Sequence, residues 1–165
     1  MYDPTIDALP KEHEKFHFFK QGIGKNSDMI TLDEAITCNG HVSHEGMILK
    51  MDIEGFEYET LYHIQDSTLA KFSQLVIEFH DVLDLTNFLL IPVLEKINKN
   101  FQYIHIHGQD VYPRVRIDDK ILPNYIEVTY LNKFLCSFSD DVDPLPLDVD
   151  MPTYAGRREI YLGKF

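Results

Sequence analysis

Residues 47–61 read Met-Ile-Leu-Lys-Met-Asp-Ile-Glu-Gly-Phe-Glu-Tyr-Glu-Thr-Leu, and this stretch decides how the rest of the chain is interpreted. Its first five residues, Met47 to Met51, form an apolar run typical of a strand that is covered on both faces. Asp52 and Glu54 follow at the expected strand end, and Gly55 then turns the chain into a helical pattern. Ligands bind beyond the carboxyl ends of strands in open α/β sheets, so both acids are candidate site residues. The alternative is a solvated turn whose acids lie near a helix N-terminus.

Composition limits the classes of partner. The chain has 165 residues, enough for one domain with a sizeable core, and 27 acidic against 15 basic residues give a formal charge of −12. This charge argues against nucleic acid and anionic membranes, which both require a basic surface. The sequence shows neither an apolar run of membrane-spanning length nor a signal peptide. The two cysteines, Cys38 and Cys136, form no disulfide framework, so we expect a cytoplasmic setting.

The segments before residue 47 predict a strand and a short helix. Asp3-Pro4 is typical of a turn that follows a strand. Phe16 to Ile23 has the aromatic content of a strand. Thr31-Leu-Asp-Glu34 resembles a capping box, which predicts a helix through about Ile36.

The segments after residue 61 predict two more core strands around a helix. Leu75 to Phe79 is a buried-strand pattern that ends at His80, and Phe101 to His107 is a third strand. Between them, apolar residues with helical spacing predict an amphipathic helix; they are Leu90, Val93, Leu94 and Ile97.

The last part of the chain predicts one strand between irregular segments. Asp110 to Asn124 is interpreted as a long connection, and Ile126 to Tyr130 alternates like an edge strand. From Ser137 onward the chain is acidic and proline-rich, so we expect a surface coil and assign it no site. Strands separated by helices predict a mostly parallel α/β sheet, with the last two strands antiparallel at one edge.

Two histidines on one strand form a further candidate site. His105 and His107 are separated by one residue, which places both imidazoles on one strand face at a spacing that suits a metal. The favoured interpretation is a face packed under a neighbouring helix, because no third ligand is fixed by the sequence. We therefore assign no metal ligands.

Several short motifs, in order, resemble the FkbM family of S-adenosylmethionine-dependent methyltransferases. The resemblance covers roughly residues 2 to 135, and Lys50-Met-Asp-Ile-Glu-Gly55 is its most specific part. The matching pieces are Tyr2-Asp3-Pro4, Gly22-Ile23-Gly24, Thr31-Leu32-Asp33, Leu49 to Glu57, Glu78-Phe79-His80, His105-Ile106-His107-Gly108, Leu122-Pro123 and Glu127-Val128-Thr129-Tyr130.

The resemblance implies a class I, Rossmann-like methyltransferase sheet that is parallel except for an antiparallel last strand. It implies S-adenosylmethionine as cofactor, with Asp3 at the ribose hydroxyls and Asp52 where the methionine end meets the acceptor. The usual chemistry of the family is O-methylation of a hydroxyl on a sugar or other small metabolite.

An alcohol acceptor must lose a proton, which requires a nearby base. Asp52, Glu54, Glu78, His80 and His107 are all predicted at the same edge of the sheet. We predict His80 or Asp52 as the base, with Glu54 orienting the base or the acceptor. The alternative for His80 is a structural imidazole, and Glu78 is expected in a buried ion pair or network.

The sequence departs from the family pattern at its start. The family begins with a central strand and a glycine-rich turn that cradles the cofactor, and no residue before Asp3 supplies them. The hypothesis is an N-terminally incomplete domain over residues 1–136 with a tail at 137–165; a chain extended upstream is predicted to bind cofactor where this chain does not. A sheet lacking that strand would have an exposed edge, which makes pairing with a second copy plausible.

Two other function classes remain open. One is a non-catalytic remnant or partner subunit that kept the fold but lost the cofactor cradle. The other is a metal-dependent hydrolase that uses Asp52, His80 and His107. Cofactor binding and metal content, respectively, discriminate these classes from a methyltransferase.

Overall fold

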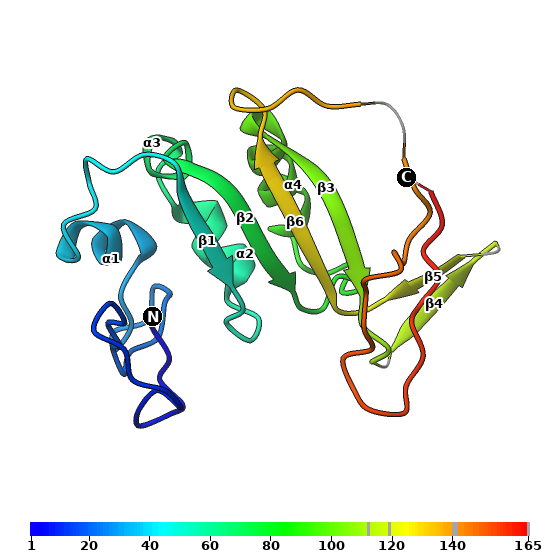
Figure 1. Cartoon of the computed structure of the whole chain (residues 1–165), viewed down its shortest axis with the longest axis horizontal. Helices are drawn as coiled ribbons and strands as arrows, with labels where there is room; N and C mark the ends of the chain where they lie inside the picture. Colours follow the sequence, from blue (N-terminus) through cyan, green and yellow to red (C-terminus); the bar gives the residue numbers. More distant parts are fainter. Residues whose placement is uncertain (112, 119, 140–141, 165) are drawn as a thin grey trace.

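The computed structural model describes residues 1–111, 113–118, 120–139 and 142–164. Its main feature is a four-stranded sheet with the order β1-β2-β6-β3 (Figure 1). The strands are β1 (Met47–Met51), β2 (Phe72–Phe79), β3 (Phe101–Gly108) and β6 (Ile126–Asn132). β1 and β2 are parallel, and β6 is antiparallel to both β2 and β3. Three strands therefore run in one direction and place their carboxyl ends at the same edge of the sheet.

In chain order, the helices are α1 (Leu32–Cys38), α2 (Glu57–His63), α3 (Asp66–Leu69) and α4 (Leu90–Asn100). The helices α2 and α4 pack against the sheet, whereas α1 lies beyond its β1 edge (Figure 1). α2 packs against α4 and β2, and α4 packs against β3. The core between these elements contains the fully buried side chains of Leu61, Leu75 and Ile97. The mixed α/β class predicted from the sequence is confirmed by this arrangement.

The predicted capping box is present at the start of α1. The hydroxyl of Thr31 accepts a hydrogen bond from the backbone N–H of Glu34 at 3.2 Å, and the Glu34 carboxylate accepts one from the Thr31 N–H at 2.9 Å. These two bonds satisfy groups that a helix N-terminus otherwise leaves unpaired.

Two predictions about the sheet were wrong. β1 is not covered on both faces, because Met51 is buried whereas Ile48 is 66% exposed. β6 is not an edge strand, because it lies between β2 and β3 and pairs with both. Both errors have one cause. The helices cover one face only, so even interior strands alternate between buried and accessible side chains.

The strand predicted at residues 16–23 is reduced to isolated bridges. Tyr2 pairs with Phe19, and Ile23 pairs with Ile30, without a continuous ladder. The rings of Tyr2 and Phe19 stack with centroids 4.7 Å apart, whereas Phe16 is 56% exposed. Aromatic content alone does not make a strand where no neighbouring segment pairs along its length.

The connection predicted over residues 110–124 contains a hairpin. β4 (Arg114–Ile117) pairs antiparallel with β5 (Lys120–Pro123), apart from the main sheet. The sequence prediction missed it because a two-stranded hairpin offers only short patterns.

The described part of the C-terminal tail is largely coil, as predicted, but three of its apolar residues are buried, whereas others such as Val149 and Met151 are exposed. Leu145, Ile160 and Leu162 form a second hydrophobic cluster, against which Ile106 of β3 packs. Asp140 and Asp141 of the acidic run lie outside the described residues.

No helix in the described part of the chain combines the length and apolar content that crossing a membrane requires.

Candidate active site

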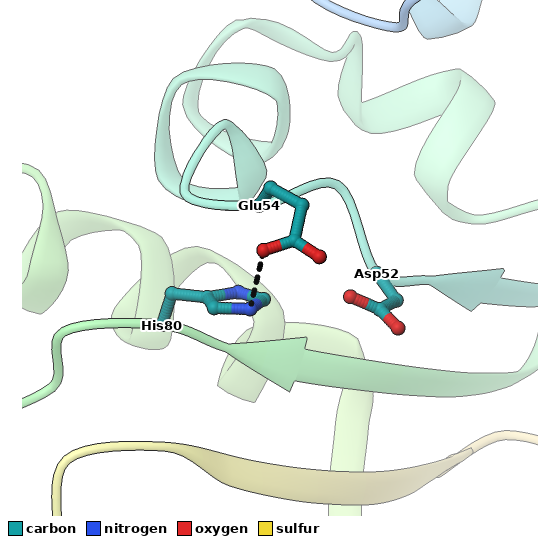
Figure 2. A group of neighbouring side chains, drawn as sticks. All are labelled: Asp52, Glu54 and His80. Atoms are coloured by element: carbon teal, nitrogen blue, oxygen red, sulfur yellow. Dashed lines mark ion pairs between the residues drawn. The ribbon is translucent and has the colours of Figure 1, made fainter. Parts of the chain in front are cut away.

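Three side chains meet at the carboxyl edge of the sheet, and we call Asp52, Glu54 and His80 the rim cluster (Figure 2). Asp52 follows β1, Glu54 lies in the turn before α2, and His80 follows β2. One ligand atom from each of the three lies within 4.8 Å of the others. The parallel pairing of β1 and β2 explains this meeting, since it brings both strand ends to one edge.

A buried carboxylate holds the imidazole of His80 in place. Nδ1 of His80 lies 3.0 Å from Oε1 of Glu57, and Glu57 is 0% exposed while His80 is 5% exposed. The same Glu57 carboxylate accepts backbone hydrogen bonds from Ile53 at 3.0 Å and from Gly55 at 3.1 Å. These hydrogen bonds fix the orientation of the Glu57 carboxylate beside the imidazole. In the neutral tautomer in which Nδ1–H donates to Glu57, the lone pair of the ring is on Nε2.

Nε2 of His80 is directed toward carboxylates of the rim. It lies 3.6 Å from Oε2 of Glu54 and 3.7 Å from Oε1 of Glu78, which is longer than a hydrogen bond. Glu54 has a positive φ of 54°, and Gly55 follows with a φ of 96°. This left-handed turn returns the exposed Glu54 carboxylate toward His80.

The acidity of Glu78 is altered by its surroundings. Burial raises the pKa of the Glu78 carboxyl, and the negative charge of Asp52 raises it further. A hydrogen bond from Nε2 of Gln109 to Oε1 of Glu78, at 2.7 Å, acts in the opposite direction. Glu78 thus belongs to a partly buried polar network, as expected for its position.

A cavity of about 670 Å³ adjoins the rim cluster. It lies among the N-terminal segment, α1 and β1, and both Asp3 and Asp52 line it. Asp3 accepts hydrogen bonds from the Thr5 hydroxyl at 2.6 Å and the Thr5 backbone N–H at 2.7 Å, which lower the pKa of its carboxyl. The apolar part of the lining includes Ile23, Leu32, Ala35 and Ile36.

His105 and His107 do not join the rim cluster. Nε2 of His105 lies 3.0 Å from Oδ1 of Asp150, and Nε2 of His107 lies 2.8 Å from Oε2 of Glu159. Both acids belong to the tail, to which the sequence assigned no site. A register irregularity between Tyr103 and His105 interrupts the alternation of β3 just before these two histidines. The combination of Asp52, His80 and His107 proposed for a hydrolase is not among the groups of possible metal ligands in the described residues.

A second cavity of about 600 Å³ lies between β3 and the tail, and none of the rim residues lines it. Of these two cavities, the first is therefore the one that adjoins the rim cluster.

A family model described as the methyltransferase FkbM domain matches residues 3–107. The chain belongs to the FkbM methyltransferase family. Asp3, the rim cluster and Glu57 all lie inside the matched segment, whereas β6 and the tail lie beyond it. The resemblance stated from sequence is confirmed, and membership of the FkbM family supports a methyltransferase-type function. Neither the curated proteins nor the solved structures contain a significant match to the chain.

The sequence did not predict the two residues that form hydrogen bonds at the rim cluster and beside it, Glu57 and Gln109. Glu57 lies in the first turn of α2, where an acid is usually an exposed group that favours the helix dipole. In the structure it is buried and contacts His80, which follows β2. Gln109 was missed because it comes one residue after β3 and reaches Glu78 only through the sheet pairing.

Proposed function

We propose that the protein is an S-adenosylmethionine-dependent methyltransferase that methylates a hydroxyl on a sugar or other small metabolite. The observation that supports this most is the position of Asp52. It lines the 670 Å³ cavity and also belongs to the rim cluster, so it joins the candidate cofactor site to the candidate base. Methyl transfer needs these two places side by side, because donor and acceptor react in line.

We further propose the class I, Rossmann-like arrangement of the family for this sheet. In its support, β1, β2 and β3 run in one direction and β6 runs against them. In that arrangement β1 corresponds to the fourth strand of the family sheet, and Asp52 lies at its carboxyl end.

The cavity suits the cofactor in size and chemistry. Its volume lies within the range of roughly 300–1,000 Å³ that is usual for small-molecule sites. Apolar side chains from α1 would contact the adenine, Asp3 would accept hydrogen bonds from the ribose hydroxyls, and Asp52 would lie at the methionine end. When bound, S-adenosylmethionine supplies an electrophilic methyl group.

The rim cluster would prepare the acceptor. Glu57 holds Nδ1–H of His80, so Nε2 can accept the proton of a hydroxyl placed between His80 and Asp52. Glu54, 3.6 Å from Nε2, would orient that hydroxyl or stabilise the protonated imidazole. Loss of the proton makes the oxygen a better nucleophile for the methyl group.

The test is methyl transfer by the full-length protein to a panel of sugars and small alcohols. Replacement of the predicted base, His80→Gln, should lower kcat by about 10²–10⁴-fold with little change in cofactor affinity. Asp52→Asn should weaken cofactor binding in calorimetry. His105→Gln is the matched control, since it changes a partly buried histidine that is paired with a carboxylate elsewhere. The same binding measurement is made on a chain extended upstream, and absence of cofactor binding by both proteins would contradict the proposal and favour a non-catalytic role.

A further inference from the structure

We propose that the rim cluster binds one divalent transition-metal ion, with Mn²⁺, Fe²⁺, Co²⁺ and Zn²⁺ as the suitable class. The ligands would be Nε2 of His80 and carboxylate oxygens of Asp52 and Glu54. One imidazole nitrogen with two carboxylates is a donor set that suits these ions better than Mg²⁺ or Ca²⁺, which prefer oxygen ligands alone. The inference goes beyond the proposed function, because binding of the ion requires neither cofactor nor acceptor.

The donor atoms are spaced slightly more widely than in a metal-bound site, as expected for ligands that have not yet moved onto an ion. All three lie within 4.8 Å of one another, and Nε2 is 3.6 Å from Oε2 of Glu54. Bonds of about 2.1 Å place neighbouring ligands about 3.0–3.4 Å apart in octahedral or tetrahedral geometry. Asp52 and Glu54 are exposed, so small rotations of their side chains suffice to reach that spacing.

The histidine provides an observation independent of the acids. His80 is 5% exposed, and its Nδ1 is anchored on the fully buried Glu57. Figure 2 shows its ring nitrogen directed at the carboxylate of Glu54, with Asp52 on the same side. Carboxylate oxygens of Glu54 and Glu78 lie 3.6 and 3.7 Å from Nε2, beyond hydrogen-bond distance. A carboxylate that holds one nitrogen while the other is free for an ion is the usual outer shell of a metal-bound histidine.

Charge at the rim also favours a cation. Asp52, Glu54, Glu57 and Glu78 surround a single imidazole. The nearby Lys50 is engaged on the sheet by Glu127, with Nζ 2.5 Å from the carboxylate. A divalent ion would offset this concentration of negative charge.

Nε2 of His80 cannot bind an ion and act as the base at the same time. A nitrogen whose lone pair binds a metal cannot accept a proton, so His80 is the proposed base only in the ion-free protein. An ion in this position would instead increase the acidity of a hydroxyl bound to it. Metal binding therefore decides which of the two tasks His80 performs.

The test is a titration of tag-free protein with Co²⁺, followed by visible absorption, and with Zn²⁺, followed by calorimetry. We expect one ion per chain and an absorption spectrum of nitrogen and oxygen ligation. His80→Gln should abolish the spectrum, and Glu54→Gln should weaken binding by at least about tenfold. The Glu54 side chain is 85% exposed, so Glu54→Gln should fold normally. It therefore tests the site even if His80→Gln, at a buried residue, misfolds.

Matched controls separate this site from other histidines and acids. His105→Gln alters a histidine that already pairs with Asp150, and Glu12→Gln alters an exposed acid of the N-terminal segment. Both should bind the ion as the unaltered protein does. Failure of Co²⁺ and Zn²⁺ to bind, or binding that Glu54→Gln leaves unchanged, would overturn the inference. Because the titration contains no cofactor, its failure is distinct from failure of methyl transfer.

Discussion

Two regions of the molecule pair histidine with a carboxylate, and they differ in how the pair is built. At the rim, His80 contacts Glu57, which is 0% exposed and also accepts backbone hydrogen bonds from Ile53 and Gly55. On β3, His107 contacts Glu159 of the tail, with side chains 16% and 20% exposed. The rim pair is part of the core, whereas the β3 pair attaches a coil to the outside of the sheet.

The comparison shows that the cost of losing one partner of a histidine–carboxylate pair depends on how deeply the pair is buried. Removing one partner of a buried pair leaves the other charged or polar group without water or protein to replace it. In the β3 region solvent can replace the lost partner more easily. The hydrogen bonding of that region is also less complete. Oε1 of Glu159 and Nδ1 of His105 are buried without a hydrogen-bond partner among the described residues.

The largest expected effect comes from removing the carboxylate of Glu57. Glu57→Ala should lower the free energy of unfolding by about 3–5 kcal/mol, because it removes the partner of the buried His80 and of two partly buried backbone N–H groups. Urea denaturation measures this change. Glu12→Ala, at an exposed acid, is the control and should have little effect. A loss below about 1 kcal/mol would show that the two regions do not differ as described.

A smaller effect is expected for the tail. Glu159→Ala should lower the free energy of unfolding by about 1 kcal/mol, the usual contribution of one hydrogen bond. Cleavage of the tail in limited proteolysis should become faster, because one of its attachments to β3 is lost. Asp148→Ala changes an exposed tail acid and is the control for the cleavage rate. Equal cleavage of both variants would contradict the attachment.

The smallest expected effect is the pH dependence due to Glu78. Its pKa is raised in the folded protein above the ordinary value of 4.5, so the folded state binds the proton more tightly than the unfolded state. The stability that this group contributes is complete below pH 4.5 and is lost as pH rises through the folded pKa. Glu78→Gln should remove this decline from a series of urea denaturations.

Gln109 provides a test of the cause. Gln109→Leu deletes the hydrogen bond that stabilises the charged carboxylate, so the decline should extend to higher pH. A profile that neither variant alters would show that another group dominates this pH range.

The convergence of the rim could be predicted because it depends on local sequence. A buried run that ends in Asp52, and another that ends in His80, locate two strand ends, and parallel pairing brings such ends together. The turn at Gly55 was predictable for the same reason. The roles of these residues in catalysis stay predictions.

The carboxylates that pair with His80 and with the β3 histidines could not be predicted. Each pair depends on how segments distant in the sequence meet in the folded chain. Glu57 has the sequence position of an exposed helix cap, and only the arrival of β2 buries it. Asp150 and Glu159 lie in a segment without periodicity, so nothing in the sequence indicates which strand they meet. The interior position of β6 was missed because a sheet covered on one face produces the same alternation in every strand.

The left-handed backbone at Glu54 has a consequence for evolution and engineering. A non-glycine residue with a φ of 54° carries strain of about 1–2 kcal/mol, which glycine would relieve. Stability alone would therefore favour Glu54→Gly, yet that change deletes a carboxylate 3.6 Å from His80. Stability and the proposed ion site make opposite demands on this position, so Glu54→Gly is expected to stabilise the fold and to weaken binding of the ion.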